Sequence, residues 1–214
     1  MRTTVTLARQ AGCGGSDIGA ALAQRLDVRC LDREIVSQTA RQLDCEEEEV
    51  AAREERGYSF WERMLRGISV SPPEALYHAP QGLTRTDREM FDAETEVMKA
   101  IASQEDCVIV GRLAAQVLPP RPGLVNVLLY APLGFRTQRL IAAGHAASEA
   151  QAQALIAQSD GTRQRHVAQM MGMEWDNVGN YHLCLDTSTL PLPEVVSLLA
   201  DFVHRRLAAQ QDSG

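Results

Sequence analysis

The N-terminal residues 4–19 contain the feature that most limits the possible folds of this chain. Residues 4–8 are β-branched or apolar, Gly12, Gly14 and Gly15 follow in a short loop, and apolar residues then recur at helical spacing from Ile18. Glycines permit positive φ angles and a close approach of the backbone to a ligand, both of which a Cβ prevents. A turn of this kind directs main-chain N–H groups and the positive end of a helix dipole at one point. The stretch therefore predicts a phosphate-binding turn between a strand and a helix.

The loop differs at two positions from the standard phosphate-binding pattern G-x-x-x-x-G-K-[ST]. When Gly14 and Ser16 are aligned with that pattern, Arg9 stands in place of the first glycine and Gly15 in place of the lysine. Ser16, the residue type that contacts Mg²⁺ in such loops, is present. The loop alone also fits a glycine-rich strand-to-helix turn in another kind of α/β protein.

Composition narrows the class of protein. A chain of 214 residues with 45% hydrophobic residues is enough for one α/β domain with a large core. The net charge of -7 argues against a general nucleic-acid-binding role. Lys99 is the only lysine, so an anion site built from side chains has to use arginine. The five cysteines are far apart, and we expect reduced thiols in a cytoplasmic protein without a signal peptide or a membrane span. The oligomeric state is not indicated.

Apolar stretches of strand length alternate with helix patterns along the chain. The expected strands cover residues 4–8, 27–32, 107–110, 124–130 and 181–186. The expected helices cover residues 33–43, 45–56, 86–102, 113–118, 146–171 and 192–207, with one more carrying Arg136 and Arg139. Residues 57–86 mix aromatic residues with helix and strand breakers, which indicates a mobile insertion. This alternation predicts an α/β fold with a five-stranded parallel sheet, helices on both faces and ligands at the carboxyl ends of the strands.

Charged residues follow several of these strands directly. Asp32 ends the second strand, Arg112 follows a continuous apolar strand, and Arg136 and Arg139 lie on the helix after the fourth. They therefore converge with the glycine loop on one edge of the sheet. Other interpretations remain open, because Asp32 can cap the next helix and helix arginines can be plain surface residues. Cys13 can be a bystander in the loop.

With these features in place, the chain resembles the cytidylate-kinase-like branch of P-loop nucleoside monophosphate kinases. The resemblance extends over most of the chain and includes the lysine-free Gly-Gly loop. The stretches that carry it are residues 9–16, 31–36, 108–112, 129–132 with Arg136 and Arg139, and 185–190.

The resemblance implies transfer of the γ-phosphoryl group of ATP, with Mg²⁺, to a nucleoside monophosphate, with CMP or dCMP as the first choice. It implies one P-loop kinase domain over residues 1–214, with an acceptor-binding insertion at 44–87 and a short helical lid at 146–171. The implied ATP-binding residues are Arg9, Gln10, Gly12, Cys13, Gly14, Gly15 and Ser16. The implied catalytic residues are Arg112, Arg136, Arg139, Arg163 and Arg165, and the implied metal-binding residues are Ser16 and Asp32.

Two departures from the family pattern define the alternatives. Leu113 follows the Gly-Arg pair, where better-known cytidylate kinases have a base-selecting aspartate. This favours a small-molecule kinase with a non-nucleotide acceptor. The missing loop lysine favours a nucleotide-binding sensor with weak or no transferase activity, unless Arg9 or a lid arginine takes over its role.

Overall fold

A five-stranded parallel sheet forms the centre of the protein, in the strand order β2-β3-β1-β4-β5. The structure is a computed structural model that describes residues 2–31, 85–111 and 113–211. The strands are β1 (Thr4–Arg9), β2 (Arg29–Leu31), β3 (Cys107–Val110), β4 (Leu124–Tyr130) and β5 (Leu183–Asp186). Because β1 lies between β3 and β4, the loop that follows β1 opens at the middle of the sheet edge.

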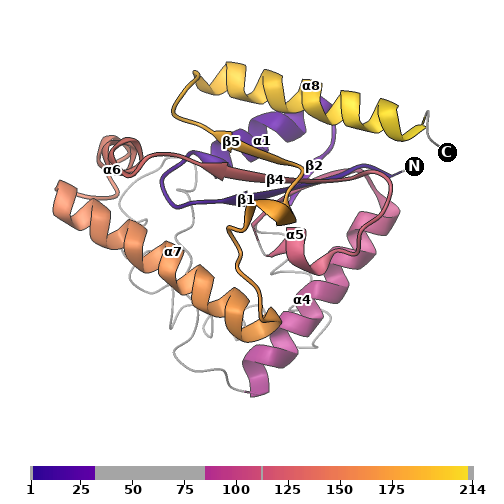
Figure 1. Cartoon of the computed structure of the whole chain (residues 1–214), viewed down its shortest axis with the longest axis horizontal. Helices are drawn as coiled ribbons and strands as arrows, with labels where there is room; N and C mark the ends of the chain where they lie inside the picture. The colour runs from indigo at the N-terminus through magenta and orange to yellow at the C-terminus, as the bar shows by residue number, and fades with distance from the viewer. Residues whose placement is uncertain (1, 32–84, 112, 212–214) are drawn as a thin grey trace.

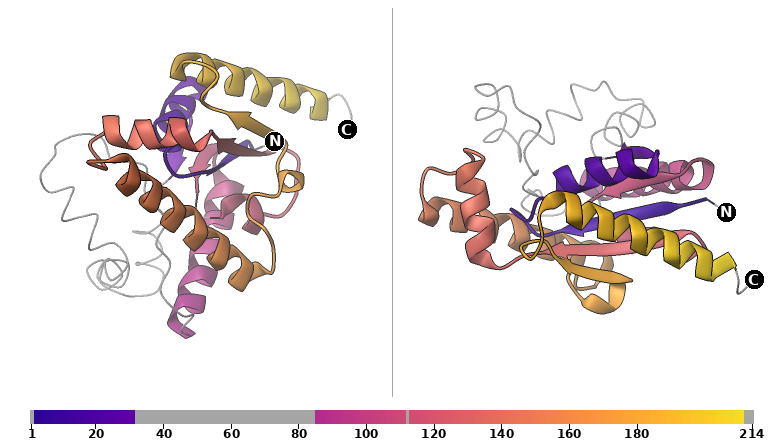
Figure 2. Two further views of the ribbon diagram at one scale, coloured as in Figure 1. Left: turned by 60° about the vertical axis from the view of Figure 1, so that its left-hand side comes forward. Right: turned by 90° about the horizontal axis from the view of Figure 1, so that it is seen from above.

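Helices cover both faces of this sheet (Figure 1). They are α1 (Gly15–Leu26), α4 (Arg85–Gln104), α5 (Ala114–Val117), α6 (Leu133–Ala142), α7 (Glu149–Met171) and α8 (Leu192–Gln211), with a 3-10 turn η1 (Val178–Asn180). α1 and α8 lie on one face, and α4, α5 and α7 lie on the other. α6 follows β4 beyond the carboxyl ends of the strands and packs against α7 (Figure 2).

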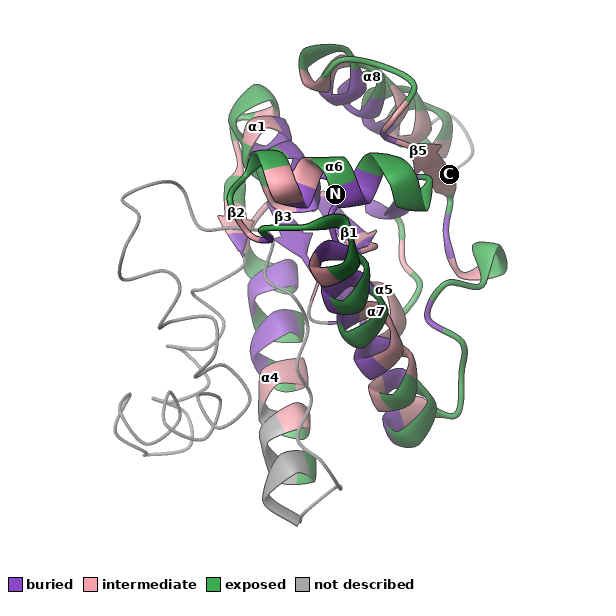
Figure 3. Cartoon of the chain, turned by 90° about the vertical axis from the view of Figure 1, so that its left-hand side faces the viewer, coloured by how far each residue is buried: buried purple, intermediate pink, exposed green. Residues whose placement is uncertain are grey.

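The central strands β1, β3 and β4 are almost wholly buried on both faces, which explains the mainly apolar sequences of β3 and β4, whereas the edge strands β2 and β5 are only partly buried. In β3, Val108 and Val110 face α1 and α8, whereas Cys107 and Ile109 face α4. All four residues are at most 1% exposed. The helices around the sheet bury one face each and leave the other exposed (Figure 3). In the described residues, no helix is long and apolar enough to cross a bilayer.

The predicted α/β fold is confirmed, with differences at the ends of several elements. β3 and β4 have the predicted bounds, and β1 is one residue longer than expected. β5 begins at Leu183 rather than at residue 181, because Tyr181 closes the 3-10 turn η1. α7 is one helix over most of the predicted stretch 146–171 and continues through Gly161 without a break. The helices expected at 33–43 and 45–56 lie outside the described residues, as does most of the insertion at 57–86.

Candidate functional site

Two glycines give the loop between β1 and α1 its shape. Gly12 has a φ of +82° and Gly14 a φ of +89°, angles that favour glycine. A Cβ on Gly12 would also lie 2.9 Å from the main-chain oxygen of Arg136. α1 begins at Gly15, directly after Gly14, and no side chain among the described residues caps its N-terminus. An uncapped helix N-terminus at a glycine turn is a suitable site for a phosphate group.

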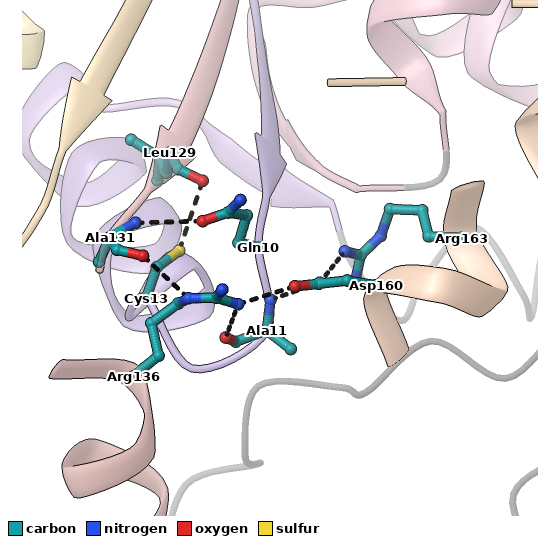
Figure 4. Close-up of polar contacts among 8 residues, drawn as sticks. All are labelled: Gln10, Ala11, Cys13, Leu129, Ala131, Arg136, Asp160 and Arg163. Carbon is teal, nitrogen blue, oxygen red and sulfur yellow. Dashed lines mark hydrogen bonds and ion pairs between the residues drawn. The ribbon is translucent and has the colours of Figure 1, made fainter. Parts of the chain in front are cut away.

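The ends of β4 and β5 hold this loop in place. The main-chain N of Gln10 donates to the oxygen of Leu129 at 3.0 Å, and its side-chain Oε1 accepts from the N of Ala131 at 3.2 Å (Figure 4). Cys13 Sγ lies 3.6 Å from the Leu129 oxygen, and Thr187 Oγ1 donates to the Cys13 oxygen at 2.7 Å. The side chains of Gln10 and Cys13 therefore contact protein, and their contribution to an anion site is through the backbone that they position.

Ser16 lies in the first turn of α1 and carries the hydroxyl expected to bind Mg²⁺. Its Oγ is buried and has no hydrogen-bond partner in the part of the chain that the structure describes. A buried hydroxyl without a partner costs free energy, and a bound cation would remove that cost. Mg²⁺ is commonly held by one or two protein oxygens together with substrate phosphates. The site therefore fits Mg²⁺ bound between Ser16 and a nucleotide.

Asp160 on α7 joins the loop to two of the predicted catalytic arginines. Its Oδ1 accepts from the Ala11 main-chain N at 2.9 Å and from Arg163 Nη1 at 3.0 Å, and its Oδ2 accepts from Arg136 Nη1 at 2.7 Å (Figure 4). Arg136 also donates through Nη1 to the Ala11 oxygen at 3.1 Å and through Nε to the Ala131 oxygen at 2.9 Å. Arg136 and Arg163 are 9% and 7% exposed. Both arginines are thus part of a buried network that holds the loop.

Arg139 lies on the same helix as Arg136 but in a more open place. Its Nη2 forms an ion pair with Asp17 Oδ2 at 2.8 Å, and its Cζ lies 3.0 Å from the position that a Cβ on Gly14 would take. This guanidinium therefore lies directly against the loop. Arg165, which lies on α7 as Arg163 does, is exposed and donates to Thr162 Oγ1 at 3.0 Å.

An apolar wall supports α7 behind this network. Arg163 lies over the Trp175 ring, with its Cζ 4.9 Å from the ring centroid. The Tyr181 hydroxyl donates to the Trp175 oxygen and accepts from Gln116 Nε2 at 2.8 Å. Burial raises the pKa of Tyr181 to about 12, so the phenol stays protonated at neutral pH. Leu113 packs in the same cluster and is 8% exposed.

The remaining predicted residues fall into two groups. Arg9 is buried at the end of β1, with its side chain passing Gly15 and ending beside Gly111. Arg112 and Asp32 lie outside the described residues. The position of Gly111, whose N donates to the Leu7 oxygen at 2.9 Å, places the end of β3 next to the start of the loop.

Sequence reasoning missed three residues that shape this site. Asp160, Asp17 and Thr187 contact the loop or its arginines, yet none was singled out as a site residue. Asp160 and the loop residue it binds are separated by 149 positions, and Thr187 and its loop partner by 174. Only the spacing of Asp160 three residues before Arg163 on a helix could have suggested an ion pair.

The strand order, the glycine loop between β1 and α1, and the arginines gathered around it define a P-loop kinase fold. A sequence profile of the Cytidylate kinase-like family matches residues 4–189. The chain therefore belongs to the cytidylate kinase-like family.

Similar solved structures agree with this assignment of the fold. An uncharacterized protein from Eubacterium ventriosum ATCC 27560 has a TM-score of 0.67 at 14% identity, covering 95% of this chain and 99% of that one. A gluconokinase from Sinorhizobium meliloti 1021 has a TM-score of 0.55 at 16% identity, covering 100% and 99%. Shikimate kinase from Acinetobacter baumannii, solved with shikimate, has a TM-score of 0.50 at 14% identity, covering 96% and 94%. No curated protein sequence matches the chain.

Proposed function

We propose that this protein transfers the γ-phosphoryl group of ATP to a nucleoside monophosphate, with CMP or dCMP as the preferred acceptor. The observation that carries the proposal is the buried Ser16 hydroxyl at the N-terminus of α1, where the described residues provide neither a hydrogen-bond partner for it nor a side-chain cap for the helix. Phosphoryl transfer needs two polyanions held in line and their charge neutralised, with little covalent chemistry from the protein. Membership of the cytidylate kinase-like family supports the same reaction.

Each part of the loop has a role in this proposal. The main-chain N–H groups of residues 12–16 bind the ATP phosphates, and Ser16 binds Mg²⁺, which neutralises phosphate charge. Arg139 stabilises the transferred group, because its guanidinium lies against Gly14 and its ion-pair partner Asp17 is 51% exposed. Arg136 and Arg163 keep the loop in shape through Asp160, so they act first as positioning residues.

We also propose roles for the predicted residues that lie outside the loop and the Asp160 network. Arg112 would hold the acceptor's phosphate and Asp32 a metal-bound water, and the acceptor would bind to the insertion at 44–87. Arg165 would contribute charge from the helical lid at 146–171. A cytoplasmic location is part of the same proposal, supported by the cysteine thiols among the described residues, which are those of Cys13, Cys30, Cys107 and Cys184.

A kinase with a non-nucleotide acceptor is the second candidate function. Leu113 stands where better-known cytidylate kinases carry a base-selecting aspartate, and its side chain is packed in an apolar cluster with Val167 and Trp175. A leucine in that place donates no hydrogen bond to a base. Two of the structural neighbours are a gluconokinase and a shikimate kinase, which favours testing hydroxyl acceptors as well.

A coupled assay of ADP release with ATP, Mg²⁺ and a panel of acceptors tests both candidates. Turnover with CMP or dCMP supports the first, and turnover only with sugar or hydroxy-acid acceptors supports the second. ATP binding without turnover of any acceptor would contradict both and favour a nucleotide sensor.

A pair of serine variants tests the metal-binding role. Ser16→Ala should lower kcat/KM by about 100-fold, as loss of a group that stabilises transition-state charge does. It should leave thermal stability unchanged or slightly higher, because the buried hydroxyl has no partner to lose in the part of the chain that the structure covers. The control is Ser103→Ala on α4, whose exposed hydroxyl donates to the Ala100 oxygen at 2.7 Å. Equal activity in the two variants would contradict the role of Ser16.

A further inference from the structure

The two positions at which the loop departs from the standard pattern are in contact with each other. A Cβ on Gly15 would lie 2.5 Å from Arg9 Cδ and 2.8 Å from Arg9 Cβ, and its three nearest neighbours are all Arg9 atoms. The stem of Arg9 therefore fills the space in which any side chain at position 15 would begin. A lysine at position 15 and an arginine at position 9 exclude one another.

The charged end of Arg9 lies between the loop and the end of β3. A Cβ on Gly111 would lie 2.0 Å from Arg9 Nη1, so the guanidinium in this position lies directly against Gly111, whose φ of +75° also favours glycine. β1 and β3 are adjacent parallel strands, with Leu7 aligned with Val110. The guanidinium is thus fixed at the carboxyl ends of the two central strands, where ligands of such sheets bind. Arg9 is 7% exposed, so the surrounding protein holds it in this place.

We infer that Arg9 supplies the positive charge that the standard loop takes from its lysine. The glycine at position 15 leaves room for Arg9, so the two departures from the standard pattern are one coupled change. This inference rests on the proposed function for the identity of its ligand, the β- and γ-phosphates of ATP. During transfer an acceptor oxygen bonds to the γ-phosphorus while the bond to the bridging oxygen breaks. The electron pair stays on the ADP oxygen, and Arg9 neutralises the charge that develops there.

A guanidinium suits this role because it stays charged and can contact two phosphate oxygens at once. Its origin on β1 rather than on α1 brings the guanidinium against Gly111 at the end of β3. The arrangement gives a physical reason for the lysine-free loop and removes the main argument for an inactive sensor.

A double-mutant cycle on the full chain tests the inference. Arg9→Gly combined with Gly15→Lys converts the loop into the standard sequence Gly-Gln-Ala-Gly-Cys-Gly-Lys-Ser. Arg9→Gly alone should lower kcat/KM by about 100-fold. Gly15→Lys alone should also lower it, because the new side chain collides with the Arg9 stem. The double variant should have a kcat/KM at least about tenfold above that of Arg9→Gly. Gly15→Lys would then lower activity when Arg9 is present and raise it when Arg9 is replaced by glycine.

The affinity for a fluorescent ATP analogue, measured on the same four proteins, separates this inference from the proposed function. If the wild type turns over an acceptor but Gly15→Lys does not rescue Arg9→Gly in rate or affinity, the inference fails alone. If the wild type binds the analogue without turnover, the proposed function fails, and the same rescue in affinity supports Arg9. Absence of binding by the wild type overturns both. Thermal denaturation of each variant identifies loss of folding, and Arg9→Lys, which keeps the charge, should retain more activity than Arg9→Gly if folding is intact.

Discussion

The Asp160 network offers the sharpest prediction about what holds the phosphate loop in shape. Asp160→Ala removes the acceptor of three hydrogen bonds, one from the loop and two from guanidinium groups, at 2.9, 2.7 and 3.0 Å. Loss of one partner of a buried ion pair costs about 3–5 kcal/mol. The Asp160 side chain is 20% exposed, which places the expected cost at the lower end, about 3 kcal/mol. In a chain of this length each kcal/mol lowers Tm by about 2–4 °C, so Tm should fall by about 6–12 °C.

A second ion pair, whose arginine lies on α6 as Arg136 does, provides a matched control. Arg139 pairs with Asp17 at 2.8 Å, a distance nearly equal to the 2.7 Å between Arg136 and Asp160. Asp17 is 51% exposed, and exposed pairs contribute only about 0–1 kcal/mol. Asp17→Ala should therefore shift Tm by at most about 4 °C.

The assay is thermal unfolding followed by circular dichroism, together with titration of the ATP analogue. Asp160→Ala should weaken binding of the analogue as well as stability, because the Ala11 N–H loses its partner and the loop loosens. Asp160→Asn keeps an acceptor for that N–H, so its Tm and its affinity for the analogue should lie between those of the wild type and of Asp160→Ala. Equal changes in Tm for Asp160→Ala and Asp17→Ala would refute the reasoning, since burial would then make no difference.

Two further predictions concern the loop backbone and pH. Gly12→Ala should weaken nucleotide binding strongly, because the new Cβ would collide with the backbone of α6 in addition to the strain of a positive φ. The control is Gly144→Ala, because Gly144 has a similar φ of +76° but no described atom within 4 Å of a new Cβ, and this change should cost only about 1–2 kcal/mol of stability. Equal effects of the two on binding would show that the collision is unimportant. Burial, and to a smaller extent the charge of Arg206, lowers the pKa of His182, whose Nδ1 accepts from the Asn126 N at 2.9 Å. The unfolded state therefore takes up the proton first, and the free energy of unfolding should be constant above the ordinary pKa of 6.5 and fall as pH drops below it. Urea denaturation above and below that pH should show the fall in the wild type and a smaller one in His182→Gln; an unchanged slope would contradict it.

Much of the fold could be predicted because its central strands are buried on both faces. β3 is a continuous apolar run that ends at Gly111, and β4 is an apolar run interrupted only by Asn126 between Gly123 and Pro132, so the sequence predicts the ends of both. The ends of β2 and β5 were harder, because local interactions decide them. Asp27 takes a left-handed conformation that ends α1, and Tyr181 belongs to a 3-10 turn.

The site could be predicted only as far as local sequence determines it. The glycine loop and Ser16 were found because a strand, a turn and a helix follow one another directly. The network around Asp160 was not, because it joins three segments that only folding brings together. The contact between Arg9 and Gly15 could be predicted in part. The sequence shows both departures from the standard pattern, but only the structure shows that the Arg9 side chain passes directly over Gly15.

A crystal structure with ADP and Mg²⁺ tests the central claim most directly, namely that the loop after β1 holds the phosphates of a nucleotide. We predict that the β-phosphate oxygens accept hydrogen bonds from the main-chain N atoms of residues 12–16 and that Mg²⁺ binds Ser16 Oγ. ADP bound at another surface, with the Ser16 hydroxyl still without a partner, would contradict the account.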